Sequence, residues 1–204
     1  MLNCGDSIMT VHPLFQEEGD GLIPISPLQF EVDEIGVDMA MLLNEEWHSV
    51  LPVTQKGNLL RNRRSVFYAA HFANRYYATA IWTTPVAANR LEDGFDWLEL
   101  RRLAISDDSP KNTATRMLKV MRIHIKKKYP ELIGLLSYQS VDHHEGTIYK
   151  AAGWSAAAKN KSAVWHKGKV RNKQQTASDK IRWEFRLRDS PTKKPSEPGL
   201  VADR

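Results

Sequence analysis

Cysteine is almost absent from the sequence, because Cys4 is the single cysteine among 204 residues. One cysteine cannot form an internal disulfide, which is typical of a protein from a reducing compartment, and it excludes a zinc site built from paired CxxC motifs. Apolar runs are also short, since none approaches the roughly 20 residues that a membrane-spanning helix needs. The N-terminus lacks the basic and then apolar pattern of a signal peptide. We therefore expect a soluble intracellular protein.

Acidic residues are scarce in one part of the chain. The whole sequence carries 29 Lys and Arg against 24 Asp and Glu, a formal net charge of +5. Between Lys159 and Arg188 there are ten basic residues, whereas Asp179 and Glu184 are the two acidic ones. Such a block favours a polyanionic partner, most simply nucleic acid, although a solvated basic face explains the same pattern.

The length of the chain predicts one domain, because 204 residues with 42% hydrophobic residues can bury one sizeable core. Residues 1–26 mix glycine, proline and charge without a clear period and predict an irregular N-terminal arm. Residues 189–204 have the composition of a disordered tail. The domain is therefore expected to cover residues 27–188.

Alternating and helical hydrophobic periods predict strands and helices in an order typical of an α+β protein. We expect one mixed, mostly antiparallel sheet flanked by helices. The predicted strands are Leu28–Val32, Ser65–Phe72, Tyr76–Thr84, Trp97–Ile105, Leu132–Gln139, Ser162–Lys167 and Lys180–Leu187, and the predicted helices are one that Asp33 caps, Ala114–Tyr129, and a short one within Glu145–Trp154.

The first two predicted helices are amphipathic. The first is expected to begin after Asp33 and to bring His48 to its C-terminal end, and the second is expected to end at Pro130. The apolar side is predicted to comprise Ile35, Met39, Leu42, Leu43 and Trp47 in the first helix, and Met117, Leu118, Met121, Ile125 and Tyr129 in the second.

The segment SDDSPKNT joins the strand ending at Ile105 to the second helix. A strand that runs into a helix N-terminus presents free backbone amides and the positive end of the helix dipole, which suits a pyrophosphate. Ordinary capping by Ser109 or Asn112 explains the same residues. On the binding interpretation, the candidate cofactor-binding residues are Ser109, Lys111, Asn112 and Thr113.

Two features of the second half of the chain resemble a known fold. They are the strand order with its loop-to-helix joint after Ile105, and the Tyr-x-x-x-Gly-Trp ending of the segment EGTIYKAAGW. Both are similar to the GNAT family of N-acetyltransferases. This resemblance implies that acetyl-CoA lies in a cleft between two central parallel strands, and that Tyr149 protonates the departing thiolate. The pyrophosphate loop of that family usually carries glycines, and the segment SDDSPKNTAT contains none.

A closer resemblance covers at least Trp97 to Trp154. The segments ELRRLAISDDSPKNTATRML and LLSYQSVDHHEGTIYKAAGW are similar to the Mom family of phage DNA-modifying proteins. The resemblance implies an enzyme that converts the N6 amine of adenine in duplex DNA to an N6-carbamoylmethyl group and so protects phage DNA from host restriction. Double-stranded DNA and acetyl-CoA are then the expected partners, without a membrane, in the cytoplasm of the phage-infected bacterium.

Tyr149 is the first candidate catalytic residue. At helical spacing it lies on the same side as Gly146 and Gly153, which are small enough to let a thioester approach closely. A phenol with a pKa near 10 can donate a proton to a thiolate. Packing in the core explains an isolated tyrosine equally simply.

Asp142 and Arg101 are further candidates for the catalytic site. Asp142 follows the strand LLSYQ and could orient the exocyclic amine of adenine or accept its proton, or else cap the next helix. Arg101 and Arg102 are expected to point to opposite faces of their strand, with Arg101 toward the cleft. A charge there needs a partner, such as a phosphate of DNA or CoA or a neighbouring acid such as Glu99.

The implied product raises the question of a metal. Simple acyl transfer cannot make a carbamoylmethyl group, because the bond to N6 forms at the methyl carbon, and bond formation at an unactivated carbon favours a redox metal. Asp142, His143 and His144 are suitable residue types for iron, although consecutive side chains seldom all point at one ion. His48 could be a base, a metal ligand or a positive charge at a helix C-terminus.

Chemistry on adenine N6 usually requires the base to leave the stack, so a pocket with aromatic walls is expected. Trp47, Tyr68, Tyr138 and Trp154 are candidate walls, and each is equally suited to a core. We assign substrate contacts to Tyr138 and Trp47. The candidates for gripping DNA phosphates are Arg61, Arg63, Arg64, Lys167, Lys169, Arg171 and Lys173.

Two alternative functions remain open from the sequence. An ordinary N-acetyltransferase acting on a small amine or a protein would produce an acetylated product and would not need the basic block. A non-catalytic DNA-binding protein on a degenerate acetyltransferase scaffold would account for the missing loop glycines.

Overall fold

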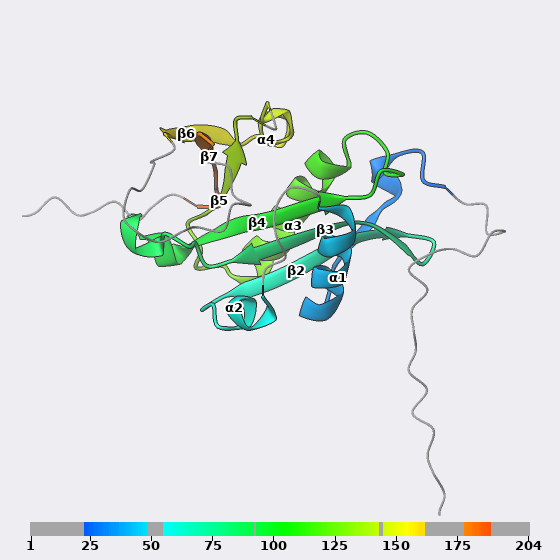
Figure 1. Ribbon diagram of the computed structural model, residues 1–204, viewed down its shortest axis with the longest axis horizontal. Coiled ribbons are helices and arrows are strands. Elements are labelled where there is room, and N and C mark those ends of the chain that lie inside the picture. The colour runs from blue at the N-terminus through cyan, green and yellow to red at the C-terminus, as the bar shows by residue number, and fades with distance from the viewer. Residues whose placement is uncertain (1–22, 49–54, 92, 143–144, 162–177, 189–204) are drawn as a thin grey trace, which may run out of the picture.

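The computed structural model describes residues 23–48, 55–91, 93–142, 145–161 and 178–188 (Figure 1). Seven strands form one sheet in the order β1-β2-β3-β4-β5-β7-β6. All neighbouring strands are antiparallel except β4 and β5, which confirms the predicted α+β class with a mixed, mostly antiparallel sheet. The strands and α-helices are β1 (Glu31–Glu34), α1 (Val37–Trp47), α2 (Lys56–Leu60), β2 (Ser65–Phe72), β3 (Arg75–Thr83), β4 (Trp97–Ile105), α3 (Thr113–Lys128), β5 (Gly134–Ser140), α4 (Thr147–Ala151), β6 (Ser155–Asn160) and β7 (Lys180–Arg186).

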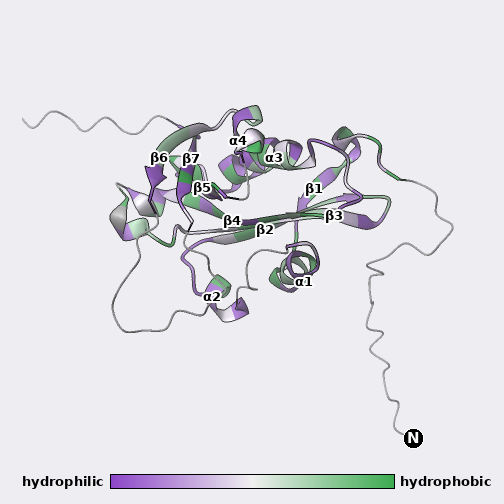
Figure 2. Ribbon diagram, turned by 45° about the horizontal axis from the view of Figure 1, so that its top comes forward, coloured by the Kyte–Doolittle hydropathy of each residue, from purple (hydrophilic) through white to green (hydrophobic). Residues whose placement is uncertain are grey.

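Helices cover both faces of the sheet. α1 and α2 lie on one face, here called the α1 face, and α3 and α4 lie on the other, here called the α3 face (Figure 2). Side chains alternate along each strand, so Phe67 and Ile81 pack under α1, whereas Tyr68 and Trp82 belong to the larger core cluster under α3. No helix in the described part of the chain is long and apolar enough to cross a membrane.

The long helix α3 has the amphipathic face that its sequence predicts. Met117, Leu118, Met121 and Ile125 are all buried against the sheet. Tyr129 caps the C-terminus of α3 and is only partly buried. These contacts fix α3 across the sheet and so fix the loop that joins it to β4.

The predicted strands Ser65–Phe72 and Tyr76–Thr84 form an antiparallel hairpin, β2–β3, with a tight turn at Ala73 and Asn74. Ala73 and Asn74 both have positive φ, at 47° and 61°. Two successive left-handed residues are typical of a type I′ turn, whose twist matches that of the flanking strands. Arg75 is therefore the first residue of β3.

The N-terminal elements begin later than predicted. Leu28 lies in a short 3-10 turn that Ser26 caps, and β1 starts only at Glu31. Asp33 does not cap α1, because it belongs to β1 and its carboxylate is 2.8 Å from Nε2 of His71; Gly36 occupies the N-cap position. The buried side of α1 comprises Ala40, Leu43 and Asn44, whereas Leu42, which the sequence predicts to be on that side, is 44% exposed.

Among the described α-helices and strands, the sequence pattern does not predict the short helix α2 and the edge strand β6. β6 has no alternating apolar pattern, and it is a strand because it pairs with β7. The strand predicted at Ser162–Lys167 lies outside the described residues. The strand predicted at Lys180–Leu187 is confirmed as β7, between β5 and β6.

Gly134 allows β4 and β5 to approach closely. A Cβ atom at this position would lie 2.5 Å from Cζ3 of Trp97 and 2.8 Å from the carbonyl oxygen of Phe185. The variant Gly134→Ala is therefore expected to lower the free energy of unfolding by about 1–3 kcal/mol, measured by urea denaturation.

The matched control for this substitution is Gly57→Ala in α2. A Cβ atom there would meet only the flexible end of Arg61, at 3.4 Å. Alanine is also a better helix former than glycine, so this variant should be as stable as the parent or slightly more stable. Equal urea midpoints for the two variants would contradict the close approach of β4 and β5.

Candidate active site

β4 and β5 are the two neighbouring parallel strands, and they pair over only part of their length. Their Cα partners run from Trp97 opposite Gly134 to Leu100 opposite Ser137. Beyond that point β4 continues alongside β3, whereas β5 continues alongside β7. The backbone edges that face each other there no longer pair. We call this opening, which begins after Leu100 and Ser137, the fork.

β4 carries one extra residue where the fork begins. Trp82 pairs with Leu100, and the preceding Ile81 pairs with Arg102, so Arg101 has no partner in β3. Such a bulge leaves the extra residue out of the hydrogen-bond ladder. Arg102 therefore faces the same way as Ile81, toward the α1 face. The expectation that Arg101 and Arg102 point to opposite faces is wrong, because it assumed an unbroken alternation along β4.

Tyr149 lies on the α3 face at the last paired position before the fork. Its hydroxyl is 2.8 Å from Oγ of Ser137, and that Oγ is 3.3 Å from the carbonyl oxygen of Leu100. The Ser137 hydroxyl has one proton, so when it donates to Leu100 it accepts from the phenol of Tyr149. The Tyr149 ring stacks on Trp183, with centroids 5.5 Å apart and planes 13° apart.

Tyr149 is buried more deeply than the sequence predicts for a proton donor, since the residue is 8% exposed. Burial raises the pKa of the phenol above its ordinary value, and the hydrogen bond with Ser137 offsets only part of that effect. The phenol therefore stays protonated at neutral pH. It can donate a hydrogen bond to a thiolate, and Ser137 is the neighbour through which a proton can be exchanged.

The position of Tyr149 depends on Gly146, the N-cap residue of α4. Gly146 has φ of 73°, and a Cβ atom on it would lie 2.5 Å from both Oε1 of Gln139 and Cζ2 of Trp183. Asp142 is exposed and does not occupy that cap position, so its interpretation as a helix cap is wrong. Its proposed contact with adenine stays a prediction.

Glu99 is a site carboxylate that the sequence analysis named only as a partner for arginine. It is 6% exposed, on the α1 face of β4, one residue before Leu100, the last residue of β4 that pairs with β5. The backbone N–H of Val86 donates to its Oε2 at 2.9 Å, and Nε of Arg101 is 3.5 Å from its Oε1. Burial raises the pKa of Glu99 above its ordinary value, while the Val86 hydrogen bond and the Arg101 charge partly oppose this.

The signal for Glu99 is present in the sequence in retrospect. A central strand read as WLELRRLAI should bury its alternate residues, and an acid in the middle of that strand is a buried charge that needs a reason. What the sequence does not show is the contact with the distant Val86 backbone, which keeps the carboxylate in place.

Among the candidate aromatic walls, Tyr138 fits best. It is half-buried in β5, on the same face as Glu99, and Arg182 lies opposite it in β7. Burial raises the pKa of the Tyr138 phenol, with a smaller contribution from Glu99. Tyr68 and Trp154 are instead part of the core under α3, at 1% and 4% exposure, so the structure does not make them walls of a pocket.

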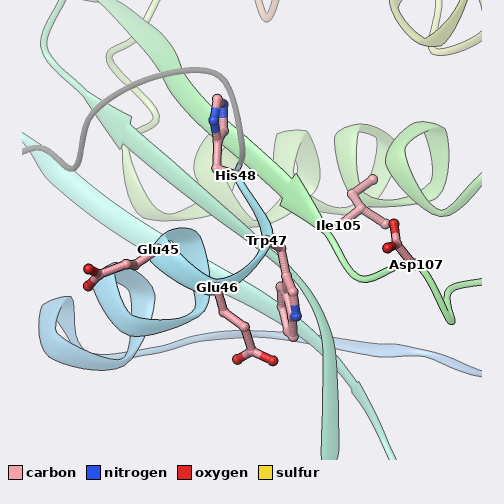
Figure 3. Close-up of a pocket in the computed structure, with 6 residues that line it drawn as sticks. All are labelled: Glu45, Glu46, Trp47, His48, Ile105 and Asp107. Atoms are coloured by element: carbon pink, nitrogen blue, oxygen red, sulfur yellow. The ribbon is translucent and has the colours of Figure 1, made fainter. Parts of the chain in front are cut away.

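Trp47 and His48 meet at a pocket of about 260 Å³ between the end of α1 and the end of β4 (Figure 3). Ile105 at this pocket is five residues beyond Leu100, roughly 16 Å along the strand, so the pocket is not where the fork begins. Figure 3 shows the side chains of Glu46 and His48 pointing in different directions, so they do not converge on one ion. His48 is at the C-terminal end of α1, as predicted, and its role as a base stays a prediction. The lining residues are Glu45, Glu46, Trp47, His48, Ile105 and Asp107.

The loop between β4 and α3 is held by its own hydrogen bonds. Asn112 is the N-cap residue, with φ of 70° and no side-chain capping bond. Ser109 donates from its hydroxyl to the carbonyl oxygen of Tyr77 at 2.8 Å, and Thr113 donates to that of Pro110 at 2.7 Å. Lys111, like Asn112, is exposed. The predicted contacts of Ser109, Lys111, Asn112 and Thr113 with a cofactor stay predictions.

The predicted phosphate contacts fall into three groups. Arg61 and Arg63 are exposed in the loop after α2. The Arg64 side chain is 10% exposed and is bound to Glu131, 2.9 Å away, and to the carbonyl oxygen of Phe95. The remaining candidates lie outside the described residues, and they are Lys167, Lys169, Arg171 and Lys173.

The metal prediction finds no support at the fork. His143 and His144 lie outside the described residues. Within the described part of the chain, the side chains that come close enough to share an ion are those of Glu31, Asp33 and His71. They lie on β1 and β2, and β2 is two strands away from β4, so they are not part of the fork. The described residues around the fork therefore do not form a set of iron ligands.

Solved structures with the same fold are acetyltransferases. A probable acetyltransferase from Staphylococcus epidermidis gives a TM-score of 0.57 at 11% identity, covering 78% of this chain and 99% of that one. The ribosomal-protein-S18-alanine N-acetyltransferase of Escherichia coli gives 0.56 at 12% identity, covering 80% and 97%. A Bacillus subtilis acetyltransferase solved in complex with CoA gives 0.52 at 13% identity, covering 78% and 98%. The chain therefore has the GNAT acetyltransferase fold.

Comparison with curated proteins finds no match. Comparison with protein-family models finds the Mom protein family over residues 81–194, which is more than half of the 204-residue chain. The matched residues include both strands of the fork, α3, α4 and β7. The chain belongs to the Mom protein family.

Proposed function

We propose that this protein is a DNA-modifying transferase that takes acetyl-CoA as donor and installs a carbamoylmethyl group on N6 of adenine in duplex DNA. The observation that carries the proposal is the family match at residues 81–194, which covers β4 and β5, the two strands of the fork, together with Tyr149, Glu99 and Tyr138. The modification would act in the cytoplasm of the phage-infected bacterium, where it would protect phage DNA from host restriction.

The geometry of the fork supports a position for the donor. A thioester could lie between the parted strands. Its carbonyl oxygen could accept hydrogen bonds from backbone N–H groups that the bulge at Arg101 leaves without a partner in the β-sheet. Its sulfur would then be on the α3 face, within reach of the Tyr149 hydroxyl. The proposal is supported by the B. subtilis acetyltransferase, a protein of this fold that was solved in complex with CoA.

The groups on the opposite side of the sheet support a position for the acceptor. Tyr149 is on the α3 face, whereas Glu99, Arg101 and Tyr138 are on the α1 face or at its edge. The bond to N6 forms at the methyl carbon, which is the end of the acetyl group away from the sulfur that Tyr149 stabilises. Adenine therefore approaches from the α1 face, where Tyr138 can stack on the extruded base and Glu99 can accept the proton of its amine.

The complete reaction needs two co-reactants besides the thioester. Transfer of the acyl carbon to ammonia or an equivalent nitrogen forms the carboxamide and releases the thiolate, which Tyr149 stabilises. Formation of the bond between N6 and the methyl carbon removes one hydrogen from each atom, so the second co-reactant is a two-electron oxidant that takes up both hydrogens, for example dioxygen, which would be reduced to hydrogen peroxide. The protein's own residues bind and orient the donor and the base, and hold the protons at Tyr149 and Glu99.

The product decides between this function and its alternatives. When the protein is co-expressed with plasmid DNA, we expect mass spectrometry of the hydrolysed nucleosides to find an adenosine heavier by one carbamoylmethyl group. An acetylated nucleoside, or acetylation of a protein or small amine with DNA unchanged, would identify an ordinary N-acetyltransferase. Unmodified nucleosides together with tight DNA binding would identify a non-catalytic DNA-binding protein.

A further inference from the structure

The charges of two neighbouring arginines at the bulge of β4 act on one buried carboxylate, that of Glu99. Arg101 is 23% exposed in its side chain, and its Nε lies 3.5 Å from Oε1 of Glu99, a long contact for an ion pair. Arg102 is partly buried beside it, and its Nη1 donates to the carbonyl oxygen of Arg101 at 2.7 Å. Nε of Arg102 is buried and has no hydrogen-bond partner in the described structure. The pair therefore has more donors than acceptors.

The cations around this pair do not relieve the imbalance. Arg182 has its own acid, since its Nε lies 2.8 Å from Oε1 of Glu184. Lys180 is exposed on β7, and its charge acts on Glu99 together with those of the two arginines. Glu99 thus faces three positive charges, and burial together with the neighbouring Arg101 charge lowers the pKa of Arg102. The site lacks negative charge.

A phosphodiester is the anion that this arrangement fits. Each guanidinium presents a planar fork of N–H donors, and a phosphate offers two non-bridging oxygens in matching geometry. The bulge turns Arg102 toward the α1 face, where Arg101 is paired with Glu99, and the charges of both arginines act on that carboxylate. A single phosphate between them would supply acceptors for both and compensate the excess charge.

We propose that Arg101 and Arg102 together bind a backbone phosphate of the acceptor DNA next to the extruded adenine. The assignment rests on the proposed function, and it names where the DNA lies on the enzyme. A base that leaves the stack remains joined to its own 5′ and 3′ phosphates, so a cationic pair beside the base site on the α1 face meets one of them. Such a contact positions the base without reading its sequence.

A phosphate of CoA could also bind the two arginines. A pyrophosphate is expected at the N-terminus of α3, beyond Ile105, and Arg102 is three residues before Ile105, roughly 10 Å along the strand. The pair is also on the face away from Tyr149. These two facts favour the phosphate of DNA over that of the donor.

The test is the salt dependence of DNA binding, measured by fluorescence anisotropy with a labelled duplex oligonucleotide between 50 and 200 mM salt, a range over which loss of phosphate contacts is large. Each phosphate contact contributes about 0.9 to the slope of log affinity against log salt concentration. Arg102→Gln should therefore bind DNA more weakly and reduce this slope by about one contact. Arg102→Lys keeps the charge and should restore the slope.

Arg75→Gln is the matched control. The Arg75 side chain is 24% exposed, similar to Arg101, but it is paired with Asp108. Its substitution should leave the slope unchanged. Because Arg102→Gln removes a partly buried charge that has no acid partner of its own, its thermal midpoint should not fall below that of the parent, so a weaker slope cannot be attributed to unfolding.

Three results would overturn the assignment. An unchanged slope for Arg102→Gln, with steep salt dependence in the parent, would refute the phosphate contact and leave the proposed function standing. Weaker binding of CoA to Arg102→Gln in calorimetry, with DNA binding unchanged, would assign the pair to the donor. A flat salt response of the parent protein would remove both the phosphate contact and the proposed action on DNA.

Discussion

Replacement of Tyr149 by phenylalanine is expected to lower the rate of adenine modification by roughly 10²–10⁴-fold, the usual contribution of a positioned proton donor. The hydroxyl sits at the point where the parallel strands part, 2.8 Å from Oγ of Ser137. Phenylalanine keeps the stacking on Trp183 and loses only the donor. The rate is measured by mass spectrometry of DNA nucleosides over a time course after induction.

The loss of the hydroxyl should affect stability far less than activity. One hydrogen bond contributes about 1 kcal/mol, and Ser137 keeps its contact with the carbonyl oxygen of Leu100. Binding of DNA should not change, because the hydroxyl is on the α3 face. Full activity of Tyr149→Phe would show that this tyrosine is a core residue and would remove the main support for the proposed proton donor.

Tyr77→Phe is the matched control for this experiment. Tyr77 is completely buried on the same face of the sheet, and its hydroxyl has no hydrogen-bond partner in the described structure. Removing an unsatisfied buried hydroxyl should leave activity unchanged and keep or raise stability. A comparable loss of activity in both variants would mean that the assay reports packing rather than proton donation.

The parts of the fold that the sequence predicts are those set by local patterns. Trp97–Ile105 has the bounds expected of β4, because it is an apolar segment that SDDSPKNT ends. The buried side of α3 follows from its helical period, and Pro130 lies just beyond its end. The fork itself follows from the chain order, because a strand, a crossover helix and a second strand place two parallel strands side by side.

The parts that the sequence does not predict depend on partners distant in the chain. The bulge at Arg101 arises from the register between β3 and β4 and turns Arg102 to the other face of the sheet. The residue types of β4 alone do not indicate it. Glu99 is held by the backbone of Val86, in a loop that has no pattern of its own. The burial of Tyr149 depends on Trp183 in β7, which enters the sheet beside β5.

Replacement of Glu99 by glutamine should remove the base on the acceptor side. The expected loss in rate is again roughly 10²–10⁴-fold, because glutamine has nearly the same shape and can still accept from Val86 but cannot take a proton. The parent enzyme should also lose activity as the pH falls. A base must be ionised to act, and burial raises the pKa of Glu99 above its ordinary value of 4.5.

The pH dependence of the rate tests whether Glu99, rather than a neighbouring carboxylate, is the base. Activity of the parent should rise with pH through the raised pKa of Glu99, and Glu99→Gln should lack this rise. Glu184→Gln is the control, because Glu184 is partly buried on β7, separated from Glu99 by Leu136 of β5, and is paired with Arg182 at 2.8 Å. It should retain the pH profile of the parent. A Glu99→Gln enzyme with the parent's rate and pH profile would show that the carboxylate only neutralises the arginines at the bulge, and the proton of adenine N6 would then need another acceptor on the α1 face.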